Sequence, residues 1–166
     1  SRFKYFLSQE LKVPVKNIKT LVLGGHGDTM VPMPDRTTVA GKPLKELIKK
    51  EKLDLIIDRT RKGGAEIIKL LEKGSAFYAP AAAGVEMAES FLKNLKKILP
   101  CAAYLDGEYG IKNLYAGVPV VIGNKGVEKI IELPLNKEEK KNFNLSIKAV
   151  KELFDQAIKI DDSLNK

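Results

Sequence analysis

Residues 101–133, CAAYLDGEYGIKNLYAGVPVVIGNKGVEKIIEL, decide the fold class of this chain. The stretch contains short β-favouring runs separated by glycine-containing turns; the runs are Cys101 to Leu105, Pro119 to Gly123 and Val127 to Leu133. Strands joined by such short turns pair in antiparallel fashion, because a parallel pair needs a long crossover connection. The stretch therefore predicts a small antiparallel sheet.

The periodicity of the apolar residues predicts the elements on either side of this sheet. In chain order they are a helix over residues 3–11, short strands over 18–23 and 35–41, a helical segment from residue 43, helices over 53–72 and 81–99, and a long amphipathic helix over about 136–163. Pro80 is placed to open the helix at residue 81, whose alanine-rich start we expect to be largely buried. Helices, then a meander, then a helix indicate the α+β class, with the helices packed on the small antiparallel sheet.

Composition limits the classes of protein that remain. The 166 residues are 44% hydrophobic, which suits a single domain over residues 1–166 with one compact core. No run approaches the ~18 to 20 apolar residues of a membrane helix and no secretory signal is visible. We therefore expect a soluble, cytoplasmic chain without a membrane partner. One histidine and one cysteine, Cys101, supply too few soft ligands for zinc, although carboxylates can hold a hard cation; we expect no metal.

The net charge of +8 permits an anionic partner such as a carboxylate, a phosphate or a nucleic acid. Most lysines, however, alternate with glutamates in helical stretches, as at residues 137–141, which is typical of a solvated helix face. No one-sided basic stripe and no set of aromatic residues for base stacking is evident, so we expect no nucleic acid partner. A basic anion-binding or nucleic-acid-binding module is the alternative from a different class.

The only histidine lies in residues 22–34, VLGGHGDTMVPMP, where a predicted strand ends at glycines. The Gly-x-Gly-x-x-Gly fingerprint of dinucleotide sites is absent, and so is a phosphate-binding loop. The glycines leave His26 unshielded, and an imidazole exchanges protons near neutral pH. From spacing alone, His26 is either a catalytic acid and base or a hydrogen-bonded turn histidine, and the nearby Asp28 is not established as its partner.

A second glycine pair, Gly63 and Gly64, interrupts the predicted helix over residues 53–72. Each glycine inside a helix costs about 1 kcal/mol relative to alanine. The pair therefore indicates a kink, or the close approach of another backbone or a ligand.

Residues 24–32, GGHGDTMVP, closely resemble the catalytic histidine segment of the lactate/malate dehydrogenase family, and residues 1–3, SRF, resemble the end of its Leu-Asp-x-x-Arg-Phe motif. The interval of 24 residues between Arg2 and His26 also agrees with the family. Further similar phrases are DRTRKGG at 58–64, GSAFYAPAA at 74–82, GEYG at 107–110 and GVP at 117–119. The resemblance covers essentially the whole chain and is strongest to the malate dehydrogenases of the lactate dehydrogenase-like type.

The resemblance implies roles for particular residues. His26 would donate and accept the proton as a hydride passes between NAD and the hydroxyl-bearing carbon of malate or oxaloacetate. Arg2 would hold the substrate carboxylate, because a planar guanidinium grips a carboxylate with two parallel hydrogen bonds. Ser75 lies in a segment that borders the substrate and nicotinamide in the family, although a serine at the approach to a helix is an equal alternative. The segment around Gly63 resembles the family's active-site helix, with ordinary helix packing as an equal alternative.

The resemblance also implies parts that lie outside this chain: the N-terminal NAD-binding Rossmann domain, the mobile specificity loop, and the aspartate that orients the histidine, two positions before Ser1. We therefore expect the C-terminal, substrate-binding half of an NAD-dependent malate dehydrogenase of the tricarboxylic acid cycle. We expect it to be a homo-oligomer, dimer or tetramer, and inactive as the isolated chain. The C-terminal domain of a lactate dehydrogenase is the nearest alternative, because the discriminating loop is not in the chain.

Overall fold

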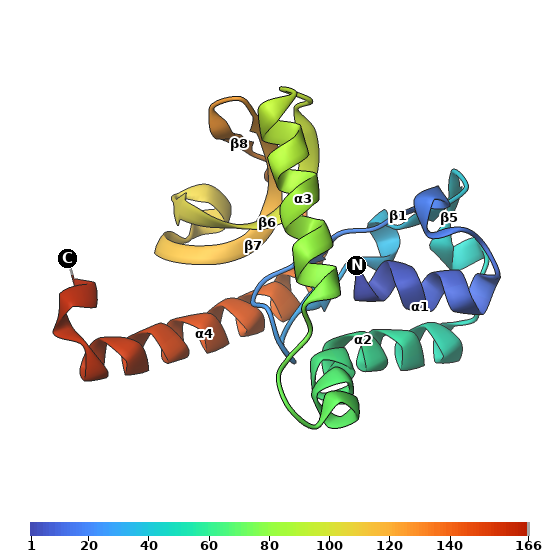
Figure 1. The fold of residues 1–166 in the computed structure, drawn as a ribbon, viewed down its shortest axis with the longest axis horizontal. Coiled ribbons are helices and arrows are strands. Elements are labelled where there is room, and N and C mark those ends of the chain that lie inside the picture. The colour runs from blue at the N-terminus through green and yellow to red at the C-terminus, as the bar shows by residue number, and fades with distance from the viewer. Residues whose placement is uncertain (166) are drawn as a thin grey trace.

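The computed structural model describes residues 1–165 and consists of helices and small antiparallel sheets, as Figure 1 shows. Its α-helices are α1 (Arg2–Leu11), α2 (Lys50–Leu71), α3 (Tyr78–Leu92) and α4 (Lys137–Ile160). Its strands are β1 (Ile18–Lys19), β2 (Val22–Leu23), β3 (Val31–Pro32), β4 (Thr38–Val39), β5 (Lys42–Pro43), β6 (Lys97–Asp106), β7 (Lys112–Gly123) and β8 (Gly126–Ile130). This order of elements confirms the predicted α+β class.

Strands β6, β7 and β8 form a three-stranded antiparallel sheet, which is the predicted meander. Side chains alternate between the two faces of a strand, so one face of this sheet is buried and the other is exposed. The buried face belongs to a core that contains Cys101, Ala103, Leu105, Ala116, Val118, Val120, Ile122 and, from α4, Phe143. Tyr104 and Tyr115 lie on the opposite, exposed face. Helix α4 therefore covers only the inner face of the sheet.

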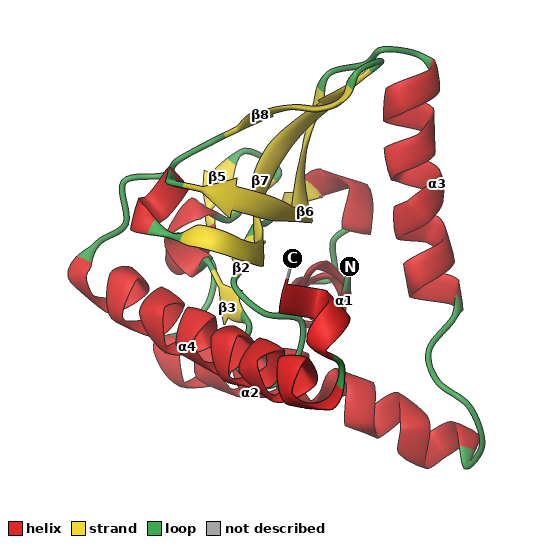
Figure 2. Cartoon of the chain, turned by 90° about the vertical axis from the view of Figure 1, so that its left-hand side faces the viewer, coloured by secondary structure: helices red, strands yellow, loops and turns green. Residues whose placement is uncertain are grey.

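Helix α3 differs from the prediction in length and in burial. It ends at Leu92 rather than at residue 99, because Asn94 and Lys96 take left-handed backbone conformations and residues 97–99 join β6 opposite β7. Its alanine-rich start is exposed, not buried: Tyr78 is 82% and Val85 is 68% accessible. Figure 2 shows the reason, since α3 stands apart from the sheet over most of its length. Only its C-terminal part, at the buried Ser90, is fastened to β7.

The first half of the chain forms a second core between α1, α2 and the short strands. The buried residues of this core are Phe3, Leu7, Ile18, Val39, Leu44, Leu53 and Ile56. The predicted strand over residues 18–23 is wrong as a single strand, because β1 pairs with β4 whereas β2 pairs with β3. The predicted strand over 35–41 is limited to β4, and the helical segment from residue 43 is only a 3₁₀ turn at Leu44–Glu46. Helix α2 runs unbroken through the glycine pair.

Helix α4 confirms the predicted amphipathic C-terminal helix. It begins at a reciprocal capping box, in which the Glu139 amide donates to the Asn136 side chain and the Asn136 amide donates to Glu139, both at 2.9 Å. This arrangement satisfies two amides that the first turn of a helix leaves free. The first half of α4 packs under the sheet of β6, β7 and β8, which we call the large sheet, and the second half extends away from it (Figure 1). Within residues 1–165, no helix is long and apolar enough to cross a membrane.

Candidate functional site

The loop between β2 and β3 carries His26, and its first residues are tied to the large sheet. Gly24 has a left-handed φ of +83°, a conformation that glycine adopts without strain. Gly24 and Gly117 of β7 exchange both of their backbone hydrogen bonds, each at 2.8 Å. A side chain at Gly117 would strike the Gly24 carbonyl, so both positions require glycine. The backbone just before His26 is therefore held by a strand nearly one hundred residues away in sequence.

Two helices hold the rest of this loop. The amide of Gly25 donates to the Ser146 hydroxyl of α4 at 2.8 Å. Farther along the loop, the carbonyl of Met30 accepts a hydrogen bond from Nε of Arg61, on α2, at 3.1 Å. The imidazole of His26 lies between these two attachment points and is exposed to solvent. The loop thus presents a single titratable ring on a backbone that is fixed on both sides.

The side chain of Arg2 meets His26 across this loop. Its Nη2 lies 3.4 Å from Nε2 of His26, and its Nη1 donates to the carbonyl of Thr60 at 3.3 Å. A guanidinium can only donate hydrogen bonds, so a hydrogen bond between these two atoms requires Nε2 to be the acceptor, which is the tautomer with its proton on Nδ1. The structure therefore brings together the two residues that the sequence singled out.

Helix α2 makes room for Arg2 at the glycine pair. A Cβ atom at Gly63 would lie 2.9 Å from Cδ of Arg2, which is closer than carbon atoms normally approach. A Cβ atom at Gly64 would lie 3.5 Å from Nη1 of Arg2, an ordinary contact. The glycine pair predicted a kink or the close approach of another backbone or a ligand, and this is wrong in kind: the helix is unbroken, and the group that approaches is the side chain of Arg2.

Ser75 and Asp28 stay outside this pair. Ser75 is exposed in the loop between α2 and α3, which lies at the edge of the molecule in Figure 2, and no hydrogen bond within residues 1–165 links it to Arg2 or His26. Its proposed contact with substrate stays a prediction. Asp28 is exposed and forms no ion pair with His26 in the described part of the chain. Within the same residues, no three His, Cys, Asp or Glu side chains are arranged to hold a metal ion.

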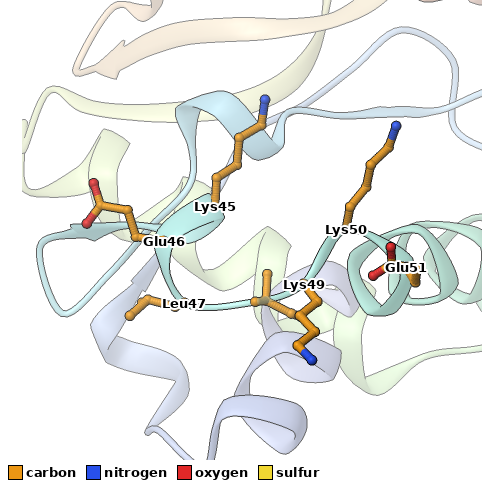
Figure 3. A pocket seen from close by; sticks show the side chains of 7 residues that line it. Lys45, Glu46, Leu47, Lys49, Lys50 and Glu51 are labelled. Carbon is orange, nitrogen blue, oxygen red and sulfur yellow. The ribbon is translucent and has the colours of Figure 1, made fainter.

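A shallow hollow at the start of α2 offers no comparable chemistry. Figure 3 shows that Lys45 and Lys50 point to one side of the chain there, whereas Lys49 points to the other. Lys45 is engaged by Asp35, whose carboxylate raises the pKa of the lysine. Since Lys45 is paired with Asp35 and Lys49 points away from Lys50, the hollow does not bring several free charges to one ligand. The Arg2 and His26 pair remains the candidate site.

Comparison with known proteins identifies the family. The family model for the C-terminal domain of lactate/malate dehydrogenases, described as alpha/beta, matches residues 1–160. The chain belongs to this family. A malate dehydrogenase of Pelagibacter ubique is 62% identical over all of this chain, which spans 53% of that relative.

Solved structures agree. A malate dehydrogenase from Salinibacter ruber matches with a TM-score of 0.93 and 46% identity, covering 98% of this chain and 53% of that one. A lactate dehydrogenase from Eimeria maxima, solved with NADH and oxamate, matches with a TM-score of 0.91 and 41% identity, covering 98% of this chain and 52% of that one. The chain therefore spans about half the length of these relatives, and its recognition as a C-terminal domain of the family is confirmed.

Sequence reasoning missed the residues that hold the loop, namely Ser146, Arg61 and Gly117. Ser146 did leave a signal, because it lies on the same helical stripe as Phe143, Ile147 and Val150, where an apolar residue is expected. A hydroxyl at a buried position needs a hydrogen-bond partner. The sequence could not show that this partner is the amide of Gly25, more than a hundred residues away.

Proposed function

We propose that this domain is the substrate-binding and catalytic half of an NAD-dependent malate dehydrogenase, an oxidoreductase that interconverts malate and oxaloacetate. The observation that carries the proposal is the distance of 3.4 Å between Nη2 of Arg2 and Nε2 of His26. A 2-hydroxy acid carries its carboxylate and its hydroxyl on neighbouring carbons. A cation that binds the first and a base that serves the second must therefore lie close together, as these two groups do.

Each residue has a distinct task in this proposal. Arg2 donates two hydrogen bonds to the substrate carboxylate and so fixes the orientation of the neighbouring carbon. Nε2 of His26, which is an acceptor in the neutral ring, takes the proton of the malate hydroxyl during oxidation. In the reverse direction the protonated ring returns this proton to the oxygen that forms from the oxaloacetate carbonyl. General acid and base catalysis of this kind typically contributes about 10² to 10⁴ in rate.

NAD, when bound, accepts the hydride from the hydroxyl-bearing carbon of malate, and NADH supplies it to the carbonyl carbon of oxaloacetate. The residues of this chain fit the substrate rather than the cofactor, since Arg2 offers donors for a carboxylate and the chain contains no Gly-x-Gly-x-x-Gly fingerprint. We place the main NAD site in the part of the protein outside this chain, which accounts for about half of each relative. The Eimeria maxima relative, solved with NADH and oxamate, supports both the cofactor and a small carboxylate ligand.

Malate is the preferred substrate in this proposal because relatives named malate dehydrogenase are 62% identical in sequence and reach a TM-score of 0.93 in structure. A lactate dehydrogenase is the alternative, supported by the similarity to the Eimeria maxima structure. We also propose a homo-oligomer, since α3 exposes apolar side chains such as Val85 and Leu92. The cytoplasm and the tricarboxylic acid cycle are the setting in which we place the activity.

The test measures the oxidation of NADH by the full-length enzyme with oxaloacetate or pyruvate as the second substrate. We expect turnover with oxaloacetate to exceed turnover with pyruvate, and no turnover from residues 1–166 alone. Preference for pyruvate would support the lactate alternative. Absence of turnover with both acids, or strong oxaloacetate reduction by residues 1–166 alone, would contradict the proposal. Salt-sensitive binding to random-sequence duplex would instead favour a nucleic-acid module.

A further inference from the structure

We propose that Ser146 of α4 is a positioning residue for His26: its hydroxyl fixes the glycine turn that carries the imidazole. This inference rests on the proposed function, in which His26 moves the substrate proton. Ser146 touches neither Arg2 nor His26 by a hydrogen bond within residues 1–165, so any effect on the reaction passes through the loop.

The hydroxyl of Ser146 engages the loop on both sides of His26. Its oxygen accepts a hydrogen bond from the amide of Gly25 at 2.8 Å, and it lies 3.4 Å from the Thr29 hydroxyl. Ser146 itself is fully buried, with 0% of its surface accessible. One buried hydroxyl thus connects the residue before His26 with a residue three positions after it.

The shape of the contact shows that α4 and the loop fit each other closely. A Cβ atom at Gly24 would lie 2.8 Å from Cβ of Ser146, and a Cβ atom at Gly25 would lie 2.8 Å from Cγ2 of Val150. Both distances are shorter than ordinary carbon contacts, so the two glycines allow the backbone to lie directly against the helix. The loop has no room to move toward α4, and the Gly25 hydrogen bond prevents it from moving away.

Loss of the Ser146 hydroxyl would free the loop at this point. The Gly25 amide would remain in a partly buried place without its acceptor, and a backbone donor in that state seeks another partner. The loop would then sample conformations in which Nε2 of His26 no longer faces Arg2. A misplacement of about 1 Å in a catalytic geometry can reduce the rate roughly 10²-fold.

A matched control exists in Ser90 of α3, which is also a fully buried helix serine with 0% accessibility. Its hydroxyl donates to the Ile122 carbonyl at 2.7 Å and accepts from the Lys97 amide at 3.2 Å, far from the His26 loop in sequence. Ser90→Ala therefore removes a comparable buried hydroxyl and weakens the attachment of α3 to β7. This variant measures how much stability is lost when a buried serine hydroxyl is removed away from the His26 loop.

The experiment compares Ser146→Ala with Ser90→Ala in two measurements. Residues 1–166 contain one histidine, so the ring nitrogen and carbon-bound proton signals in NMR spectra belong to His26 alone. We expect both variants to unfold at a lower temperature than the wild type, but only Ser146→Ala to shift the His26 ring signals and to speed hydrogen exchange of the Gly25 amide. In the full-length enzyme, Ser146→Ala should reduce kcat by about 10- to 100-fold with NADH affinity unchanged, whereas Ser90→Ala should leave kcat unchanged.

Ring signals that are equally unchanged in both variants, or an unchanged kcat in Ser146→Ala, would overturn the inference. If Ser146→Ala does not fold, Ser146→Cys decides, because its thiol leaves no cavity but, unlike the hydroxyl, accepts hydrogen bonds only weakly. It should shift the His26 ring signals and speed hydrogen exchange of the Gly25 amide, and an unshifted spectrum would overturn the inference. The spectra require no substrate, so they stand even if the full-length enzyme fails to reduce oxaloacetate.

Discussion

Replacement of Gly63 by alanine distinguishes two effects of this residue: its effect on the stability of α2, and the space that it leaves for the side chain of Arg2. Alanine is favoured over glycine in a helix by about 1 kcal/mol. The new methyl group would nevertheless lie 2.9 Å from Cδ of Arg2, whereas carbon atoms in contact are normally about 3.5–4.0 Å apart. Arg2 is a flexible side chain, so it should retreat by roughly 0.5–1 Å while the helix stays in place. The guanidinium would then leave its position beside His26.

We therefore expect Gly63→Ala to retain a melting temperature close to that of the wild type and to lose kcat/KM for oxaloacetate by about 10²-fold in the full-length enzyme. Gly64→Ala is the matched control, since its methyl group would approach Nη1 of Arg2 only to 3.5 Å and should leave kcat/KM unchanged. Equal kcat/KM values in the two variants would refute the assignment of Gly63 as the space that Arg2 occupies. A large fall in the melting temperature of Gly63→Ala alone would show that the helix, rather than Arg2, gives way.

Three further changes test other parts of the structure. Arg2→Lys should lower kcat/KM for oxaloacetate by about 10²-fold, mainly through KM, because an ammonium group lacks the paired donors of a guanidinium; an unchanged KM would argue against a carboxylate at Arg2. Asn136→Ala removes the cap of α4 and should lower the free energy of unfolding by about 1 kcal/mol, measured by urea titration; no loss would mean that the capping box is dispensable. Burial raises the pKa of the Cys101 thiol, so the folded state disfavours the thiolate. Stability should therefore fall as the pH rises above the ordinary thiol range, and Cys101→Ala should remove this part of the pH dependence.

The parts of the fold that could be predicted are those that rest on local patterns. Helix α4 follows from a long apolar stripe with Phe143 at its buried part, and the meander of β6 to β8 follows from β-favouring runs between glycine turns. The boundary of α3 could not be predicted, because it depends on the left-handed conformations of Asn94 and Lys96 and on the pairing of residues 97–99 with β7. The exposure of its alanine-rich start could not be predicted either, because an apolar helix sequence predicts burial whether or not another part of the same chain covers the helix.

The candidate site shows the same division. The types and spacing of Arg2 and His26, read with the family resemblance, predicted two partners, and the structure places them 3.4 Å apart. The Gly63 and Gly64 pair predicted a kink or the approach of a backbone or a ligand, whereas the group that approaches is the side chain of Arg2. The attachments of the loop to Ser146 and Gly117 are long-range hydrogen bonds, and no local pattern encodes them. The two candidate residues could thus be singled out from the family resemblance, whereas the contacts that hold the His26 loop became visible only in the fold.

The central claim is that His26 exchanges the substrate proton, and His26→Asn in the full-length enzyme tests it most directly. Asparagine retains a polar side chain of moderate size but cannot take up a proton near neutral pH. We expect kcat for oxaloacetate reduction to fall by about 10² to 10⁴ or more, while the affinity for NADH, measured by fluorescence titration, stays that of the wild type. Retained turnover, or loss of NADH binding together with turnover, would contradict the account and make His26 a structural residue of the loop.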